Sequence, residues 1–279
     1  MIVCDLSRIE KSGAGWKVGI GRKISGALGL FQGQTLFGSC EEGSMRVFLS
    51  TLRLNPAVNY FRMYLEDVRG SLAKVTEIIK DKKINILSGG AFSFGNLWVS
   101  EFILDFKGVE VSPEEISDEI EELGGFVTIR ELTELFPRSF ELDSVFQIEG
   151  NETEGLYLSL PDDFSAKVGL TRKSALYAVL KAWPRVKALF IDFYTPETKL
   201  LKISARIRDI PGSLNALANV LKTYVDLQAL DELHHDEVSG QWVIFGVLVI
   251  GELEELIEKA KELPTVLKFE AEPLGWKAR

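Results

Sequence analysis

Two short stretches of the chain place an aspartate three residues before a glycine, at the start of a predicted helix. They are "EDVRGSL", with Asp67 and Gly70, and "RDIPGSL", with Asp209 and Gly212. A glycine here lets the backbone turn sharply from a strand into a helix, and it leaves the first helical amides open to an approaching anion. The chemistry would be the binding of a small anionic group. Pro-Gly also serves as plain turn chemistry, and that alternative stays open.

Residues for catalysis are sparse. The only two histidines, His234 and His235, are adjacent in "LHHDE", and neighbouring side chains of a strand point to opposite faces, which disfavours joint metal binding even with Asp236. The stretch "GIGRKISG" (19–26) lacks the Gly-Lys-Ser/Thr ending of a nucleotide-binding loop. We therefore expect no enzyme activity, no cofactor and no metal site.

The amino-acid composition limits the classes of protein to which the chain can belong. The chain has 279 residues, 46% hydrophobic and 26% charged, with a net charge of −9. These values are typical of a soluble globular protein of about two domains, and the acidic balance disfavours nucleic acid and anionic membranes as partners. The longest apolar run, "WVIFGVLVIG" (242–251), is too short to span a membrane, and the N-terminus has no signal-peptide pattern. We expect a cytoplasmic protein.

The sequence repeats itself. At an offset of 140, Val18 aligns with Leu158, and Gly29-Leu30 aligns with Gly169-Leu170; the Asp-x-x-Gly stretches follow at an offset of 142. The chain is thus predicted to be an internal pseudo-dimer A–B–A′–B′. The predicted domains are 1–58, 59–136, 137–198 (a linker and the second A module) and 199–279.

Each B module is predicted to have the order β-α-β-β-α-β. In the first copy a strand (59–67) precedes a helix after Gly70, two strands lie within 84–106, Ser112 to Glu115 form a capping box, and a strand (124–132) ends the module. The second copy follows with strands 199–208, 225–234, 240–250 and 265–272 and helices 212–223 and 252–262. The predicted fold class is α+β, with two ferredoxin-like βαββαβ domains.

The stretches "EDVRGSLAKVTEIIKDKKINILSGG" and "RDIPGSLNALANVLKTYVDLQAL" resemble the ACT domain. The resemblance covers 59–135 and 199–274, and it departs from the family pattern at Arg69, where proline is usual, and at Asp226, where asparagine is commoner. It implies regulation by a small ligand, typically an amino acid, bound between two paired domains. A loop glycine and aspartate of one copy would then meet the start of the second strand of the other.

Carried onto this chain, the resemblance implies two ligand pockets: Asp67 and Gly70 with Asp226, and Asp209 and Gly212 with Asn85. Helix-start amides suit a carboxylate, and an aspartate suits an ammonium group. Arg69 would pair with a ligand carboxylate. The stiffer loop with Pro211 makes the pocket of Asp209, Gly212 and Asn85 the stronger candidate. We also expect the two B modules to join edge to edge in one sheet of about eight strands, with helices on one face.

The A modules, "WKVGIGRKISGALGLFQGQTLFGS" (16–39) and "LYLSLPDDFSAKVGLTRKSALYAVLK" (156–181), resemble the swapped-hairpin domain of the AbrB family of transition-state regulators. A further strand follows in each copy (45–54 and 186–195). In that family one half-fold is incomplete until it interlocks with a second. A duplicated chain could therefore interlock its own two copies.

DNA binding by the A modules is disfavoured on charge. The family binds DNA with basic side chains, and the first copy has Arg22 and Lys23 at its helix start, but the second has Asp162 and Asp163. We expect only weak, salt-sensitive association with DNA.

The prediction is thus a non-enzymatic regulatory or sensor protein that binds a small metabolite, an amino acid, between two ACT-type domains. A protein partner or homo-oligomer fits this prediction. Two alternatives stay open: a DNA-binding transcription regulator that uses the AbrB-like modules, and a regulatory subunit of an amino-acid biosynthetic enzyme.

Overall fold

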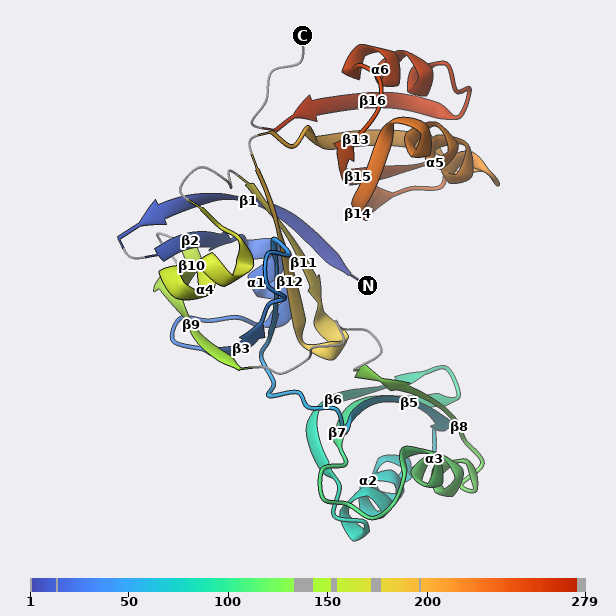
Figure 1. Cartoon of the computed structure of the whole chain (residues 1–279). Coiled ribbons are helices and arrows are strands. Elements are labelled where there is room, and N and C mark those ends of the chain that lie inside the picture. Colours follow the sequence, from blue (N-terminus) through green and yellow to red (C-terminus); the bar gives the residue numbers. More distant parts are fainter. Residues whose placement is uncertain are drawn as a thin grey trace.

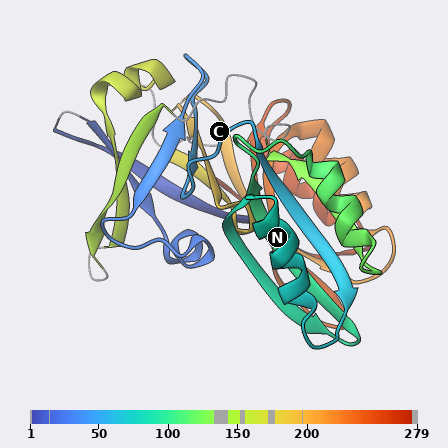
Figure 2. The ribbon, with the colours of Figure 1, turned by 90° about the horizontal axis from the view of Figure 1, so that it is seen from below.

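The chain folds into a closed β-barrel and two four-stranded sheets with helices, a mixed α+β architecture (Figure 1). The structure is a computed structural model, and it describes residues 2–13, 15–132, 143–151, 155–171, 177–195 and 197–274. In Figure 1 the barrel lies between the two sheets. Figure 2 shows the barrel on the left and the two sheets with their helices on the right.

The barrel is built from both A modules. Its strands follow the closed order β1-β11-β12-β4-β3-β9-β10-β2, so that pairs of strands from the two copies alternate around it. The strands are β1 (Val3–Ser12), β2 (Gly15–Ile20), β3 (Thr35–Ser39), β4 (Arg46–Ser50), β9 (Ser144–Asn151), β10 (Gly155–Pro161), β11 (Tyr177–Trp183) and β12 (Ala188–Tyr194). The two copies therefore interlock within one chain.

Strand register shows a pseudo-two-fold axis through the barrel. In the antiparallel ladders Val18 pairs with Leu158, 140 positions away, and Phe48 pairs with Phe190, 142 positions away. These are the two offsets of the sequence repeat, so each residue faces its own counterpart. Val18, Leu158 and Phe48 are buried, and Phe190 is partly buried. Because a residue at such an axis contacts its equivalent, both copies need an apolar residue there.

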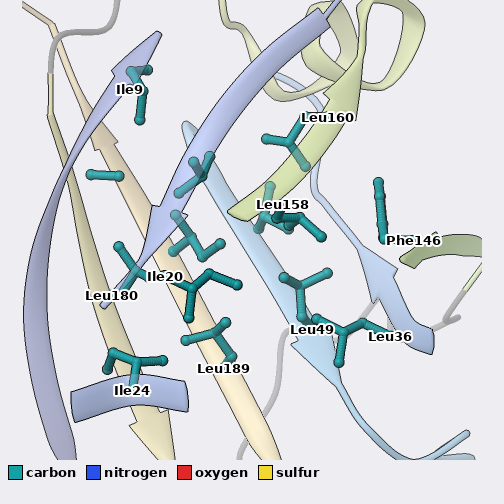
Figure 3. Packing of buried hydrophobic residues seen from close by; sticks show 14 of the residues in the cluster. Ile9, Ile20, Ile24, Leu36, Leu49, Phe146, Leu158, Leu160, Leu180 and Leu189 are labelled. Carbon is teal, nitrogen blue, oxygen red and sulfur yellow. The ribbon is translucent and has the colours of Figure 1, made fainter. Parts of the chain in front are cut away.

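The barrel interior is filled with aliphatic and aromatic side chains (Figure 3). The described part of each copy contains one short α-helix, α1 (Arg22–Leu28) in the first and α4 (Asp162–Val168) in the second. Both helices end at a glycine in the left-handed region, Gly29 (φ 68°) and Gly169 (φ 98°), where a side chain would strain the backbone. Such turns bring the next leucine back into the core.

The first sheet has the order β6-β7-β5-β8, with two helices on one face. Its elements are β5 (Val58–Glu66), α2 (Ser71–Asp81), β6 (Asn85–Phe94), β7 (Leu97–Asp105), α3 (Pro113–Glu121) and β8 (Phe126–Glu131). The predicted capping box is confirmed: the amide of Glu115 donates to Oγ of Ser112 (3.2 Å), and the amide of Ser112 donates to Oε2 of Glu115 (2.7 Å).

The second sheet repeats this design in the order β14-β15-β13-β16. Its elements are β13 (Leu200–Arg208), α5 (Ser213–Tyr224), β14 (Val225–His235), β15 (Ser239–Leu248), α6 (Leu253–Lys261) and β16 (Val266–Pro273). Both sheets thus have the element order predicted for the B modules, with strand two at an open edge.

The expectation of one continuous eight-stranded sheet is wrong, because the two sheets are separate. The physical reason lies in the central strands β7 and β15, which are apolar on both faces. One face of each strand packs against the helices of its own sheet. On the other face, Ile103 of β7 packs with Phe48 and Ala188 of the barrel, and Phe245 of β15 packs with Val179. The barrel therefore covers the helix-free face of each sheet.

Polar contacts accompany these apolar interfaces. Lys23 of α1 forms an ion pair with Asp231 of β14, whose side chain is buried. Nη1 of Arg185, which lies in the short 3₁₀ helix η2 (Pro184–Val186), is 3.3 Å from Oε1 of Glu101 of β7. Among the described residues, each sheet thus contacts the barrel through an ion pair as well as through buried apolar side chains.

Candidate functional site

Two loops of the same design begin the first helices of the two sheets. Gly70 precedes α2 with φ of 98°, and Gly212 precedes α5 with φ of 91°. Both values lie in the left-handed region, where glycine is favoured because it has no Cβ. The backbone geometry alone therefore explains why glycine is favoured at these two turns. The first amides of each helix have no acceptor within the helix itself.

Each loop is anchored to the hairpin between the second and third strands. The amide of Asp67 donates to the carbonyl of Asn96 (2.9 Å), and the amide of Asp209 donates to the carbonyl of Val238 (2.8 Å). In the first loop, Oγ of Ser71 also donates to the carbonyl of Glu66 (2.8 Å). These bonds fix both aspartates at the same place in their domains.

A cavity lies against each loop. The first, loop pocket 1, has a volume of about 580 Å³, and its lining is mainly Asp67–Ala73, Thr76 and Trp98. The second, loop pocket 2, has a volume of about 190 Å³ and is lined by 207–210, 212–215, Gly240 and Trp242. The cavities therefore occur at equivalent positions, and the first is three times the size of the second.

The tryptophans are functional candidates that the sequence analysis missed. Trp98 pairs with Leu65 in one sheet, and Trp242 pairs with Ala205 in the other, so both stand on the third strand beside the first. Nε1 of each indole is buried and has no hydrogen-bond partner among the described residues. Because a buried N–H without an acceptor costs free energy, a ligand oxygen that reached it would bind favourably. The sequence signal was a tryptophan shortly after the turn between the second and third strands of each B module.

The two aspartates have different neighbours. Asp67 accepts a hydrogen bond from Oγ of Ser93. Oδ2 of Asp209 lies 3.2 Å from Nε2 of His235, so a protonated imidazole would offset its charge. Arg69 makes no ion pair with any residue in the described ranges, and Pro211 takes its place in the other loop. Loop pocket 1 is thus lined by Asp67 and Arg69, and loop pocket 2 is lined by Asp209 and Arg208.

Asn85 and Asp226 do not meet the opposite loops within one chain. Asn85 begins β6 and Asp226 lies at the start of β14, and these strands belong to separate sheets. The carboxylate of Asp226 accepts from Nε2 of Gln228 (2.8 Å), whose Oε1 accepts from the hydroxyl of Tyr194 on the barrel (3.0 Å). Neither loop pocket is lined by Asn85 or Asp226, and within one chain the two sheets are separate.

The residues considered for other functions are placed as follows. Lys23, one of the two basic residues considered for DNA binding, is held in its ion pair with Asp231. His235 faces Asp209, and the described residues hold no group of three metal-ligating side chains. Backbone amides of Val238 and Ser239 lower the pKa of Asp236, which caps the hairpin. Within the described ranges, no helix is long and apolar enough to cross a membrane.

Comparison with known proteins shows no matching family model and no matching curated protein. Solved structures give weak likenesses. One is an unknown protein from Galdieria sulphuraria, with a TM-score of 0.32 and 10% identity over 78% of this chain and 98% of that chain. Another is a putative glycine cleavage system transcriptional repressor, with a TM-score of 0.26 and 10% identity over 78% and 98%.

A third is the small subunit of acetolactate synthase from Thermotoga maritima, with a TM-score of 0.18 and 11% identity over 77% of this chain and 93% of that chain. With TM-scores this low, none of the three carries an argument about the fold or the function of this chain.

Proposed function

We propose that the chain is a non-enzymatic regulatory protein that binds a small metabolite, an amino acid, at its Asp-x-x-Gly loops, as its resemblance to ACT domains implies. The observation that supports this most is the recurrence of one pocket design in both sheets. Each pocket combines a left-handed glycine before a helix, an aspartate anchored through its amide, and a tryptophan whose N–H lacks a partner among the described residues.

The chemistry of each part suits a zwitterion. Backbone amides at the start of α2 or α5 favour a carboxylate, and the macrodipole of the helix adds to this preference. The aspartate of the loop favours an ammonium group. The indole N–H offers one further donor to a carboxylate oxygen.

Loop pocket 1 is the stronger site in this proposal. Its volume of about 580 Å³ lies within the usual range for small-molecule sites, whereas the 190 Å³ of loop pocket 2 falls below that range. Arg69 is available to pair with a ligand carboxylate, and Asp67 faces a serine rather than a histidine. The sequence analysis favoured the loop of Asp209, and the structure gives reasons for the reverse order.

A second copy of the chain would complete each pocket in this proposal. Strand β6 forms one edge of the first sheet and contains no charged residue, although edge strands usually carry charges that oppose pairing. Its first residue, Asn85, is exposed. Pairing of β6 with the β6 strand of another chain would bring Asn85 to an interface between sheets, so we expect a homo-oligomer.

The test is a thermal-shift screen of the twenty amino acids, followed by calorimetry with any that raises Tm, because a ligand that binds only the native state stabilises it. We expect binding by the wild type, and at least tenfold weaker binding by Asp67→Asn and by Trp98→Phe. Asp209→Asn and Trp242→Phe are the matched controls in the smaller pocket. Absence of binding by the wild type, or equal affinity in the Asp67 and Trp98 variants, would reject the site.

A further inference from the structure

A larger cavity lies on the barrel, apart from both loop pockets. Its volume is about 1110 Å³, and it lies where β2 leads into α1, next to the end of β9 and the start of β10. Its lining combines apolar side chains, among them Ile20, Phe31 and Leu156, with the polar side chains of Arg22 and Ser25. We call it the barrel cavity.

The internal duplication provides a comparison for this cavity within the same molecule. Leu156 pairs with Ile20 in the ladder, and the pseudo-two-fold axis relates this pair to Trp16 and Leu160, each 140 positions away. Trp16 is only 6% exposed and belongs to the barrel core, whereas Leu156 is only partly buried. The copy with Trp16 thus fills with an indole the space that the copy with Leu156 leaves open.

The charges differ in the same way. In the filled copy, Lys11 lies over the Trp16 ring, 5.6 Å from its centroid, and forms an ion pair with Asp162 at the start of α4. In the ladders Trp16 pairs with Lys11 and Leu156 pairs with Gly150, so Gly150 stands in place of Lys11. Arg22, 140 positions before Asp162, stands in place of that aspartate.

Arg22 is exposed and makes no ion pair with any residue in the part of the chain that the structure describes. Gly150 has no side chain, so the open copy has no charged group in the place of Lys11. The filled copy therefore neutralises its helix-start charge internally, and the open copy leaves a guanidinium at the rim of an apolar cavity.

We propose that the barrel cavity binds an amphipathic anion: a small molecule with an aromatic or branched apolar body and one carboxylate or phosphate group. The apolar body takes the space that Trp16 fills in the other copy, against Ile20 and Leu156. The anionic group pairs with the guanidinium of Arg22, which is suited to bidentate contact with either oxyanion. Phe31, at 62% exposure, provides an aromatic face at the rim. This site is independent of the amino-acid pockets proposed above.

The test uses phenyl phosphate and benzoate as probes, with inorganic phosphate and benzyl alcohol as partial probes, in calorimetry on the full chain. NMR spectra of the protein labelled with ¹⁵N locate any binding through the amides of Gly21, Gly26 and Gly29, which line the cavity. We expect at least one whole probe to bind, and each partial probe to bind at least tenfold more weakly. Which whole probe binds identifies the anion.

Three variants decide the assignment. Arg22→Gln is expected to weaken binding at least tenfold, and Leu156→Trp, which reproduces the filled copy, is expected to abolish it. Arg8→Gln removes the same charge from an exposed barrel position outside the cavity, and it is expected to change nothing.

The proposal is overturned if neither whole probe binds, if benzyl alcohol or phosphate alone binds as tightly as the whole probe, or if Arg22→Gln binds as the wild type does. Because Arg22 is exposed, its variant keeps the test decisive even where Leu156→Trp fails to fold, which circular dichroism would show.

Discussion

Replacement of Gly212 by alanine isolates the contribution of backbone geometry to the loop before α5. A Cβ built at Gly212 meets no atom within 4 Å, so the substitution adds no steric clash. What it adds is a side chain at φ of 91°, and the left-handed region costs a residue with a Cβ about 1–2 kcal/mol. The alanine also restricts the unfolded chain, which returns about 0.4–1 kcal/mol. The expected net loss in the free energy of unfolding is about 1 kcal/mol.

Gly26→Ala is the matched control for this substitution. Gly26 lies inside α1 and does not have a positive φ. A Cβ built there also meets no atom within 4 Å. Alanine stands at the equivalent position of α4, Ala166. Because glycine inside a helix is less favourable than alanine, Gly26→Ala is expected to raise stability by about 0.5–1 kcal/mol. The same chemical change thus has opposite signs at the two sites.

The assay is urea unfolding followed by the fluorescence of the five tryptophans, one of which, Trp242, lines the pocket at this loop. Gly212→Ala should lower the midpoint and Gly26→Ala should raise it, with the dependence of free energy on urea unchanged in both. If Gly212→Ala is as stable as the wild type, the left-handed turn does not require glycine, and backbone geometry is refuted as the reason that glycine recurs in the two loops.

Two further predictions concern the contact between the barrel and the second sheet. Lys23→Met removes the partner of the buried Asp231 and should lower the free energy of unfolding by about 1–2 kcal/mol, because Lys23 is itself 41% exposed. Lys259→Met, which breaks a surface pair with Glu262, should have a clearly smaller effect in the same urea assay. Burial, with Asp231 nearby, raises the pKa of Cys4 to about 11, so iodoacetamide at pH 8 should label Cys40 well before Cys4. The folded state holds the Cys4 proton more tightly than the unfolded state, whose pKa is 9.0, so this group's contribution to stability is present below pH 9 and is lost as pH rises towards 11. Early labelling of Cys4, or equal costs for the two lysine variants, would contradict these expectations.

Local structure in the two sheets was predictable because the signals were local. Alternation marks β5, and the capping box at Ser112 marks the start of α3, since both depend on residues within one turn or one strand. The repeat offset of 140 also predicted which residues would be equivalent. The ladder pairs Val18 with Leu158 at that same offset.

The relation between the two sheets was not predictable in the same way. An exposed strand edge and an apolar sheet face are both stabilised when another element packs against them. The sequence alone does not show which of the two is buried within the chain. The signal for the second was present in "WVIFGVLVIG", since a strand with apolar residues on both faces is covered on both.

The loop residues were predicted, but their neighbours were not. Asp67 and Asp209 lie at equivalent places, as their spacing indicates. Trp98 and His235 reach these loops through the hairpins, whose register the sequence does not specify. The size of each pocket depends on those neighbours. For this reason the sequence favoured the loop of Asp209, although its pocket is the smaller of the two.

The pseudo-symmetry is preserved where it is required and lost elsewhere. At the axis each residue contacts its own counterpart, so one large change there would leave the two copies mismatched; Val18 faces Leu158, and both are buried. Away from the axis each copy has its own surroundings, and the copies differ in charge, as at Arg22 and Asp162.

The sheets follow the same rule. The second sheet packs against β1 and β11, whose equivalents are β9 and β3, yet the first sheet packs against β4 and β12 instead. Val145 of β9 accordingly remains 65% exposed. Duplication therefore fixed the barrel, which needs two matching halves to close, and left each sheet, each loop and each helix start free to acquire its own contacts. A difference between the copies at an exposed position is thus better evidence of a specific role than a residue that the copies share in the core, and Arg22, with its cavity, is such a difference.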